Sequence, residues 1–451
     1  MLLRLVALIA ASAILLGLAS TIAASIDEPP EASVTAVQID YDVATEGLPT
    51  LSADAPQNPE ELAALSGLEL LEALARTDVV TLQRFAATYS GEIVDELASP
   101  PPADGVVAWW SQLEEQQRDT LVGSLPRLVG NLEGVPYAAR DVANRAYLRQ
   151  AIETATSEAE RGDGGRTAHT AAETQLAMLR EIEAALGGPG AIPARSLIAV
   201  DDSWPGKAVV ALGDLDTADY VSYLVPGMFF TVQGQIVDWT EIALDIHRDE
   251  LALLHSEVAG LTYESSVATV AWMGYETPNL FTVGMLDQAR EGSERLEETV
   301  AGLRSARAAD PPHVSLIAHS YGSTAASLAL ARGALEIDAI AIVGSPGVGV
   351  QRAADFGMDR GSVFVAEASW DPVVDTAFHG ADPGSAEFGA VIMGVAGGID
   401  DVVGDTLGAV TGHLGYFEHG SESMRNFALI GLGRGDLVTG SSGRHLMAVG
   451  R

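Results

Sequence analysis

The stretch "VSLIAHSYGSTAASLAL", residues 314–330, begins as an apolar, strand-like run and ends as an alanine-rich, helix-like run. Ser320 stands at the change, with the small residues Ala318 and Gly322 two positions to either side. A strand can turn this abruptly into a helix when the turn residue takes a strained backbone conformation and its neighbours are small. The stretch therefore predicts a serine hydroxyl raised above a sheet at the positive end of a helix. A serine that only caps the helix is the alternative.

The chain around this stretch alternates between strand-like and helix-like segments from residue 194 onward. Its apolar runs are "SLIAV", "KAVVAL", "YVSYLV", "SVATVAW", "HVSLIA", "IDAIAIVG" and "SVFVAEA". Most of these runs are continuous, which is typical of strands covered on both faces. Helix-like stretches, notably residues 285–308 and 321–334, lie between several of them. Strands and helices in turn predict an α/β fold with a mostly parallel, doubly wound sheet.

Two regions of different character precede this sheet. Residues 26–57 are rich in Pro, Ala and acidic residues and are expected to form an extended linker. Helical periodicity then begins at Asn58, a plausible helix cap, and ends at the stop signal "GGPG", residues 187–190. We therefore predict a helical region over residues 58–192, an α/β domain over residues 193–435 and a tail over residues 436–451.

The N-terminal residues 1–25 read "MLLRLVALIAASAILLGLASTIAAS". Arg4 precedes an apolar run of about twenty residues, which is enough to span a bilayer. The run ends in small residues of the kind found before a signal-peptide cleavage site, and acidic residues follow it, so the charge asymmetry directs the chain outward. We predict an exported protein, either secreted after cleavage of a signal peptide or anchored at the cell envelope through residues 3–25.

The composition argues against several classes of function. The chain has 25 Lys and Arg against 62 Asp and Glu, a formal charge of −37, so it repels phosphate backbones and no nucleic acid partner is expected. It has no cysteine, which excludes disulfides, thiolate metal sites and thiol nucleophiles. The sequence contains neither an HExxH nor a P-loop pattern, so we predict no metal and no cofactor.

A serine is a poor nucleophile unless a histidine takes its proton, and on such a sheet the chain order is serine, acid, histidine. Four histidines follow Ser320: His379, His413, His419 and His445. His413 lies in "VTGHLGYFEHGSESMRNFALI", a glycine-bearing loop before a helix, and is the first choice. His419, nearer that helix, is the second choice. His379 comes too soon after the acid loop for the usual order, and His445 lies in a glycine-rich tail.

The acid that would orient this histidine is expected just after a late strand. In "SVFVAEASWDPVV" a strand runs into a loop that begins near Asp371, and this position favours Asp371 as the acid. Asp375 is the alternative, whereas Glu367 lies within the strand. An exposed loop charge is the ordinary interpretation of any one of these carboxylates in so acidic a chain.

Acyl transfer also needs backbone N–H groups that bind the negatively charged oxygen of the tetrahedral intermediate. One donor is expected from Tyr321, the residue after the nucleophile. The second is expected from the loop after an early strand, where "YVSYLVPGMFF" offers Gly227 or Met228. Glycine lets the backbone approach a substrate closely, although a plain strand-terminating turn would have the same residues.

Several phrases together resemble a known family. They are "GDLDTADYVSYLVPGM", "VAWMGYETP", "IAHSYGSTAASLA", "IVGSPGVGV" and "HGADPGSAEFGA", preceded by the helical "WWSQLEEQQRDTLVGSLPRLVGNLEGVPYAARDVANRAYL". They are similar to an exported bacterial α/β-hydrolase family whose members carry a domain of unassigned function, and the resemblance covers residues 105–430. It implies an α/β-hydrolase fold in which Ser320 is the nucleophile, Asp371 the acid and His413 the base. The family's typical turn starts with Gly, where this chain has Ala318.

These observations predict an exported serine hydrolase that cleaves an ester or a related acyl bond of a small-molecule or lipid-like substrate. Two other functions fit the same residues. An acyltransferase would use the same Ser-His-Asp triad but pass the acyl group to an alcohol other than water. A cell-envelope binding protein would keep the fold without turnover.

Overall fold

The computed structural model describes residues 56, 58–161, 165–188, 190–256, 264–374, 376–400 and 404–440. The predicted signal peptide or anchor, residues 1–25, lies outside the described residues, as do nearly all of the linker and most of the tail. None of the described helices is both long enough and apolar enough to cross a membrane.

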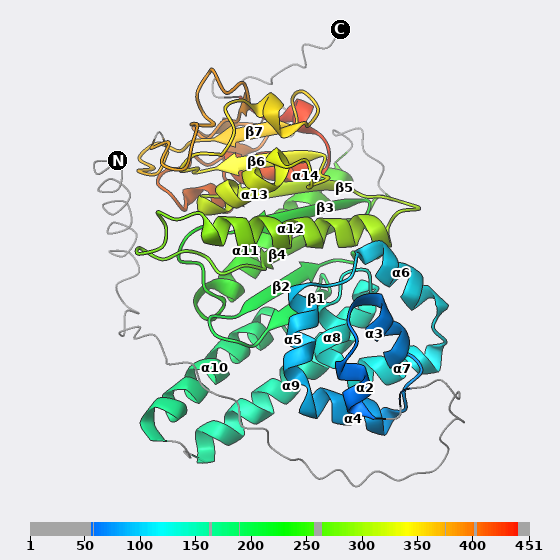
Figure 1. The fold of residues 1–451 in the computed structure, drawn as a ribbon. Coiled ribbons are helices and arrows are strands. Elements are labelled where there is room, and N and C mark those ends of the chain that lie inside the picture. The colour runs from blue at the N-terminus through cyan, green and yellow to red at the C-terminus, as the bar shows by residue number, and fades with distance from the viewer. Residues whose placement is uncertain are drawn as a thin grey trace.

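The described chain forms one large sheet and one small one. The large sheet has the strand order β1-β2-β4-β3-β5-β6-β7-β8 (Figure 1). Its strands are β1 (Arg195–Asp201), β2 (Lys207–Leu212), β3 (Tyr220–Val225), β4 (Val267–Met273), β5 (His313–His319), β6 (Ala339–Val343), β7 (Val363–Ala366) and β8 (Val391–Ile392). The strands from β4 to β8 run parallel, whereas β2 runs antiparallel to both β1 and β4. The predicted mostly parallel, doubly wound sheet is confirmed. A separate antiparallel pair is formed by β9 (Gly398–Ile399) and β10 (Thr406–Leu407).

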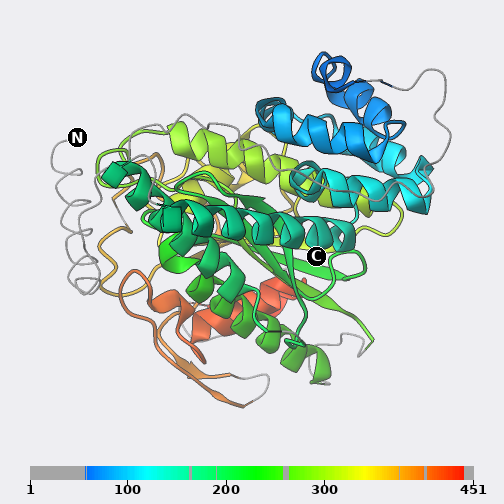
Figure 2. The same ribbon diagram turned by 90° about the horizontal axis from the view of Figure 1, so that it is seen from below.

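Helices cover both faces of the large sheet. One face packs against α11 (Val232–His255) and α14 (Glu422–Gly431), and the other against α12 (Asp287–Ala306) and α13 (Tyr321–Ala331) (Figures 1 and 2). The central strands β3, β4 and β6 are buried on both faces, which is why their sequences are continuous apolar runs. Short 3₁₀ helices connect the later elements: η1 (Ala353–Phe356), η2 (Gly415–Phe417) and η3 (Gly435–Leu437).

The helices before the sheet form two groups. They are α2 (Pro59–Ala63), α3 (Gly67–Leu74), α4 (Val79–Thr88), α5 (Ser90–Ala98), α6 (Ala103–Gln112), α7 (Glu115–Ser124), α8 (Pro126–Asn131), α9 (Tyr137–Arg161) and α10 (Gly165–Ala185). Helices α2 to α8 enclose their own apolar core, which includes Phe85 and Trp110. Helices α9 and α10 instead share a core with the sheet and α11, through residues such as Ile152 and Ile182. The boundary between helical region and α/β domain, at residues 192 and 193, stays a prediction.

A buried polar cluster ties α11 to the sheet. Glu250 is 1% exposed, and its carboxyl accepts hydrogen bonds from Ser222 Oγ at 2.6 Å and Thr269 Oγ1 at 2.9 Å. Gly431 of α14 lies against the same carboxyl, where an added Cβ would come within 2.2 Å of Oε1. Burial raises the pKa of Glu250 to about 8 and outweighs the two hydrogen bonds. The carboxyl is therefore protonated over most of the neutral range.

Replacing Glu250 with glutamine is expected to change how stability depends on pH. Because the folded pKa lies above the unfolded value of 4.5, the unfolded chain ionises first as pH rises. The wild type should thus lose stability between pH 4.5 and pH 8, by up to about 1.4 kcal/mol per pH unit from this group. Glu250→Gln should lack that loss, as measured by urea unfolding across this range. Asp238→Asn, at an exposed position of α11, should follow the wild type. Identical pH dependence in Glu250→Gln and wild type would contradict this prediction.

Candidate active site

Ser320 forms a strained turn between β5 and α13. Its backbone angles are φ 54° and ψ −128°, a conformation that non-glycine residues rarely adopt. Its N–H donates to Val343 O at 2.9 Å, which fixes the turn to the neighbouring strand. At Gly322, an added Cβ would lie 2.7 Å from Val225 O and 2.5 Å from Pro226 O, so no larger residue fits. The small residues of the motif thus allow the turn that the sequence predicts.

The structure brings three of the predicted site residues into one hydrogen-bonded chain. Ser320 Oγ lies 2.8 Å from His413 Nε2. On the other side of the ring, His413 Nδ1 lies 2.9 Å and 3.0 Å from the two carboxylate oxygens of Asp371. All three residues are buried, with 6–8% of their surfaces exposed. Asp371 comes from the loop after β7, and His413 from the loop before η2.

The surroundings of Asp371 favour its charged form. Burial opposes ionisation, but hydrogen bonds from His413, the Val373 N–H at 2.9 Å and the Tyr416 hydroxyl at 2.7 Å hold the pKa of Asp371 below its usual value. A carboxylate can only accept, so Nδ1 of His413 carries the proton that it shares with Asp371. Nε2 is then left with a lone pair that can accept the Ser320 proton.

Tyr416 is a site residue that the sequence interpretation missed. Its hydroxyl donates to Asp371 Oδ2 and accepts from the Ala368 N–H at 2.8 Å. Burial, followed by the nearby Asp371 charge, raises the pKa of Tyr416, so the hydroxyl keeps its proton and stays a donor. The only feature of the sequence that could have indicated Tyr416 is its position three residues after His413. This spacing alone does not predict that the hydroxyl reaches Asp371, because the contact depends on how the loop folds.

His319 is a second residue that was missed. It is 1% exposed, its Nε2–H donates to the backbone oxygen of His413 at 2.8 Å, and the two rings lie 4.6 Å apart. Burial, and then the neighbouring His413, lower the pKa of His319 to about 3, so it is neutral. His319 thus anchors the loop that carries the candidate base.

The other candidates among the described residues, His419, His379 and Glu367, have different neighbours. His419 is exposed and sits 3.8 Å from Asp245. The His379 ring packs edge-on against Tyr321, at a centroid distance of 5.2 Å. Glu367 lies against Gly384. Asp375 and His445 fall outside the described residues.

Two of the predicted oxyanion donors, Tyr321 and Gly227, lie beside Ser320. At Gly227, an added Cβ would be 2.5 Å from Ser320 Cβ and 3.0 Å from Ser320 Oγ. The Gly227 loop is held by Tyr275, whose hydroxyl donates to Pro226 O at 2.7 Å. Tyr321 is the first residue of α13, and first-turn N–H groups have no partner within their helix. The Tyr321 N–H and that of Gly227 or Met228 remain the candidate donors.

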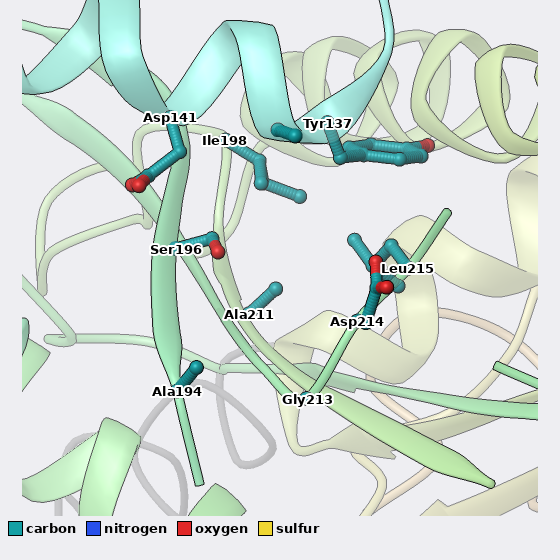
Figure 3. Close-up of a pocket in the computed structure, with 10 residues that line it drawn as sticks. Tyr137, Asp141, Ala194, Ser196, Ile198, Ala211, Gly213, Asp214 and Leu215 are labelled. Carbon is teal, nitrogen blue, oxygen red and sulfur yellow. The ribbon is translucent and has the colours of Figure 1, made fainter. Parts of the chain in front are cut away.

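A cavity of about 500 Å³ lies away from this site, between α9 and the strands β1 and β2 (Figure 3). Its two carboxylates already have partners: Asp141 accepts from the Leu197 N–H at 2.6 Å, and Asp214 accepts from the Asp216 N–H at 2.9 Å. The cavity borders Gly213 after β2, near the start of β4, whereas Ser320 follows the end of the parallel strand β5. The cavity therefore lies near the amino-terminal ends of the parallel strands, whereas Ser320 lies at their carboxyl-terminal ends. Within the described residues, no group of three His, Cys, Asp or Glu side chains could hold a metal ion.

Comparisons with known proteins match parts of this chain. A family model described as alpha/beta hydrolase matches residues 201–381. An uncharacterized protein of Mycobacterium tuberculosis is 30% identical over 384 residues, which cover 75% of this chain and 57% of that protein. An uncharacterized protein of Mycobacterium bovis is 34% identical over 206 residues, covering 45% of this chain and 75% of that protein. The matched part of this chain thus spans little more than half the length of the M. tuberculosis relative.

Among solved structures, carboxyl esterase 2 from the mycorrhizal fungus Tuber melanosporum is 12% identical, with a TM-score of 0.30. The match covers 58% of this chain and 98% of the esterase.

Proposed function

Because the chain belongs to this alpha/beta hydrolase family, we propose that it is a serine hydrolase that cleaves an ester or a related acyl bond. The observation that carries the proposal is the buried hydrogen-bonded chain from Ser320 through His413 to Asp371. A serine that only capped its helix would need neither a histidine at 2.8 Å nor a carboxylate behind that histidine.

In the proposed reaction, Ser320 Oγ attacks the carbonyl carbon of the ester while His413 Nε2 takes the hydroxyl proton. Asp371 stabilises the resulting imidazolium and keeps the ring in place. When the bond to the leaving alcohol breaks, His413 returns the proton to the alcohol oxygen. Water then attacks the acyl–Ser320 ester with His413 again as the base, and the carboxylic acid leaves as the Ser320 hydroxyl is restored.

The oxygen of the tetrahedral intermediate would be bound by the Tyr321 N–H and by the N–H of Gly227 or Met228. The contact between Gly227 and the Ser320 side chain supports this placement, because the donors must lie beside the carbon that Ser320 attacks. The dipole of α13 points its positive end at the same place and adds to the stabilisation.

A fluorophosphonate tests the proposal, because it forms a covalent bond only with an activated serine. The protein should gain one label, located at Ser320 by mass spectrometry of its peptides. Ser320→Ala should gain none. Ser327→Ala is the matched control, since Ser327 lies on α13 and donates its hydroxyl hydrogen to Thr324 O at 2.8 Å, away from His413. An unlabelled wild type, or labelling that persists in Ser320→Ala, would overturn the proposal.

A further inference from the structure

Four large apolar side chains stand exposed on the loops that follow β4 and β7 and on the loop that carries His413. Phe281 is 89% exposed and Trp370 91%, whereas Met285 and Leu414 are about half exposed. We call these four residues the apolar rim. Scattered exposed apolar residues are ordinary, but a group of them beside a site is typical of a binding surface.

Two members of the rim adjoin the acid and the base. Trp370 directly precedes Asp371, and Leu414 directly follows His413. The two loops are joined, because the Gly412 N–H donates to Ser369 O at 2.9 Å. Trp370 also has a φ of 64°, a strained conformation for a bulky residue. Neither the strain nor the exposure of the indole adds to folding stability, which points to a role in binding.

The other two members, Phe281 and Met285, lie on the loop after β4. This loop is hydrogen-bonded both to Tyr321, which follows Ser320, and to the segment that follows Gly227. The Tyr321 hydroxyl donates to Met285 O at 2.8 Å. The Phe229 N–H, next to the candidate oxyanion loop, donates to Pro278 O at 3.1 Å. The loop that carries Phe281 and Met285 is therefore held at the carboxyl-terminal ends of the parallel strands, where the loops of Trp370 and Leu414 also lie.

We propose that the substrate is an ester with an extended apolar acyl chain, and that this chain lies across the apolar rim. The inference rests on the proposed function and names its substrate class. The rim offers an acyl chain apolar contact surface beside the attacking oxygen, and covering the rim removes that surface from water. The formal charge of −37 disfavours anionic substrates, so the acyl chain belongs to a neutral ester.

The dependence of kcat/KM on acyl length tests this inference. The protein is assayed with p-nitrophenyl acetate and p-nitrophenyl octanoate, both below their aggregation concentrations. A fully buried methylene changes affinity by about fourfold, so even partial cover of the six additional methylenes should favour the octanoate by about tenfold or more. The ratio of the two kcat/KM values is the quantity compared, because it cancels any loss that both esters share.

Phe281→Ser and Trp370→Gly should each lower this ratio by about threefold or more, since each removes a large part of the rim. Val142→Ser, at a 58% exposed position on α9, is the matched control and should keep the wild-type ratio. A wild-type ratio near one, or a ratio that neither rim variant changes, would overturn the inference while fluorophosphonate labelling of Ser320 still upheld the hydrolase. If neither ester is cleaved and Ser320 is not labelled, the proposed function fails and this inference fails with it.

Discussion

Replacing His413 with alanine will lower kcat/KM for a soluble ester such as p-nitrophenyl acetate by about 10²–10⁴-fold. The imidazole is the group that lies 2.8 Å from Ser320 Oγ, so its removal leaves the hydroxyl without a base. The loss should appear mainly in kcat, because proton transfer occurs in the transition state and not in substrate binding. Fluorophosphonate labelling of Ser320 should slow by a similar factor, which gives a second measurement independent of the ester chosen.

His419→Ala is the control for this experiment. His419 was the second choice for the base, yet its side chain is 75% exposed and faces Asp245. The variant should retain wild-type kcat/KM and labelling rate. Full activity in His413→Ala would contradict the assignment of the base and return His419 and His379 to consideration.

The sequence was informative where function depends on local spacing. Ala318 and Gly322 around Ser320 predicted the strained turn, because small residues at this fixed spacing from a serine are themselves the mark of such a turn. What Gly322 avoids was not predictable from this spacing, since an added Cβ would collide with the carbonyl oxygens of Val225 and Pro226. The continuous apolar runs predicted the parallel sheet for a similar reason, since burial on both faces leaves its mark on each strand separately. His413 and Asp371 were chosen from chain order and from the loops that they occupy.

The sequence was less informative where distant segments meet. His319 reads as part of the serine motif, and only the folded chain shows its N–H directed at the backbone of a residue 94 positions away. Tyr416 likewise reads as an apolar loop residue until its hydroxyl is found on Asp371. The shared core of α9, α10 and the sheet had no sequence signal either, because helical periodicity shows that one face is buried but not what covers it.

Replacing Gly227 with alanine is expected to have the second large effect. The new methyl group would lie 2.5 Å from Ser320 Cβ and 3.0 Å from both Ser320 Oγ and His319 O, distances at which backbone or nucleophile must shift. The shift would move the Gly227 loop away from the carbonyl oxygen of the substrate. Loss of one oxyanion donor costs about 10²–10³-fold in kcat, and we expect kcat/KM for p-nitrophenyl acetate to fall by at least about 10²-fold.

Gly123→Ala separates this effect from a general cost of replacing glycine. Gly123 lies in α7, where an added Cβ meets nothing within 4 Å, and alanine favours a helix by about 1 kcal/mol over glycine. This control should keep wild-type kcat/KM and should not lower Tm. Gly227→Ala should lose activity at temperatures well below its own Tm, because the crowded methyl group acts on the reacting oxygen itself. Wild-type kcat/KM in Gly227→Ala would mean that the loop does not approach the carbonyl, and the second oxyanion donor would have to come from another segment.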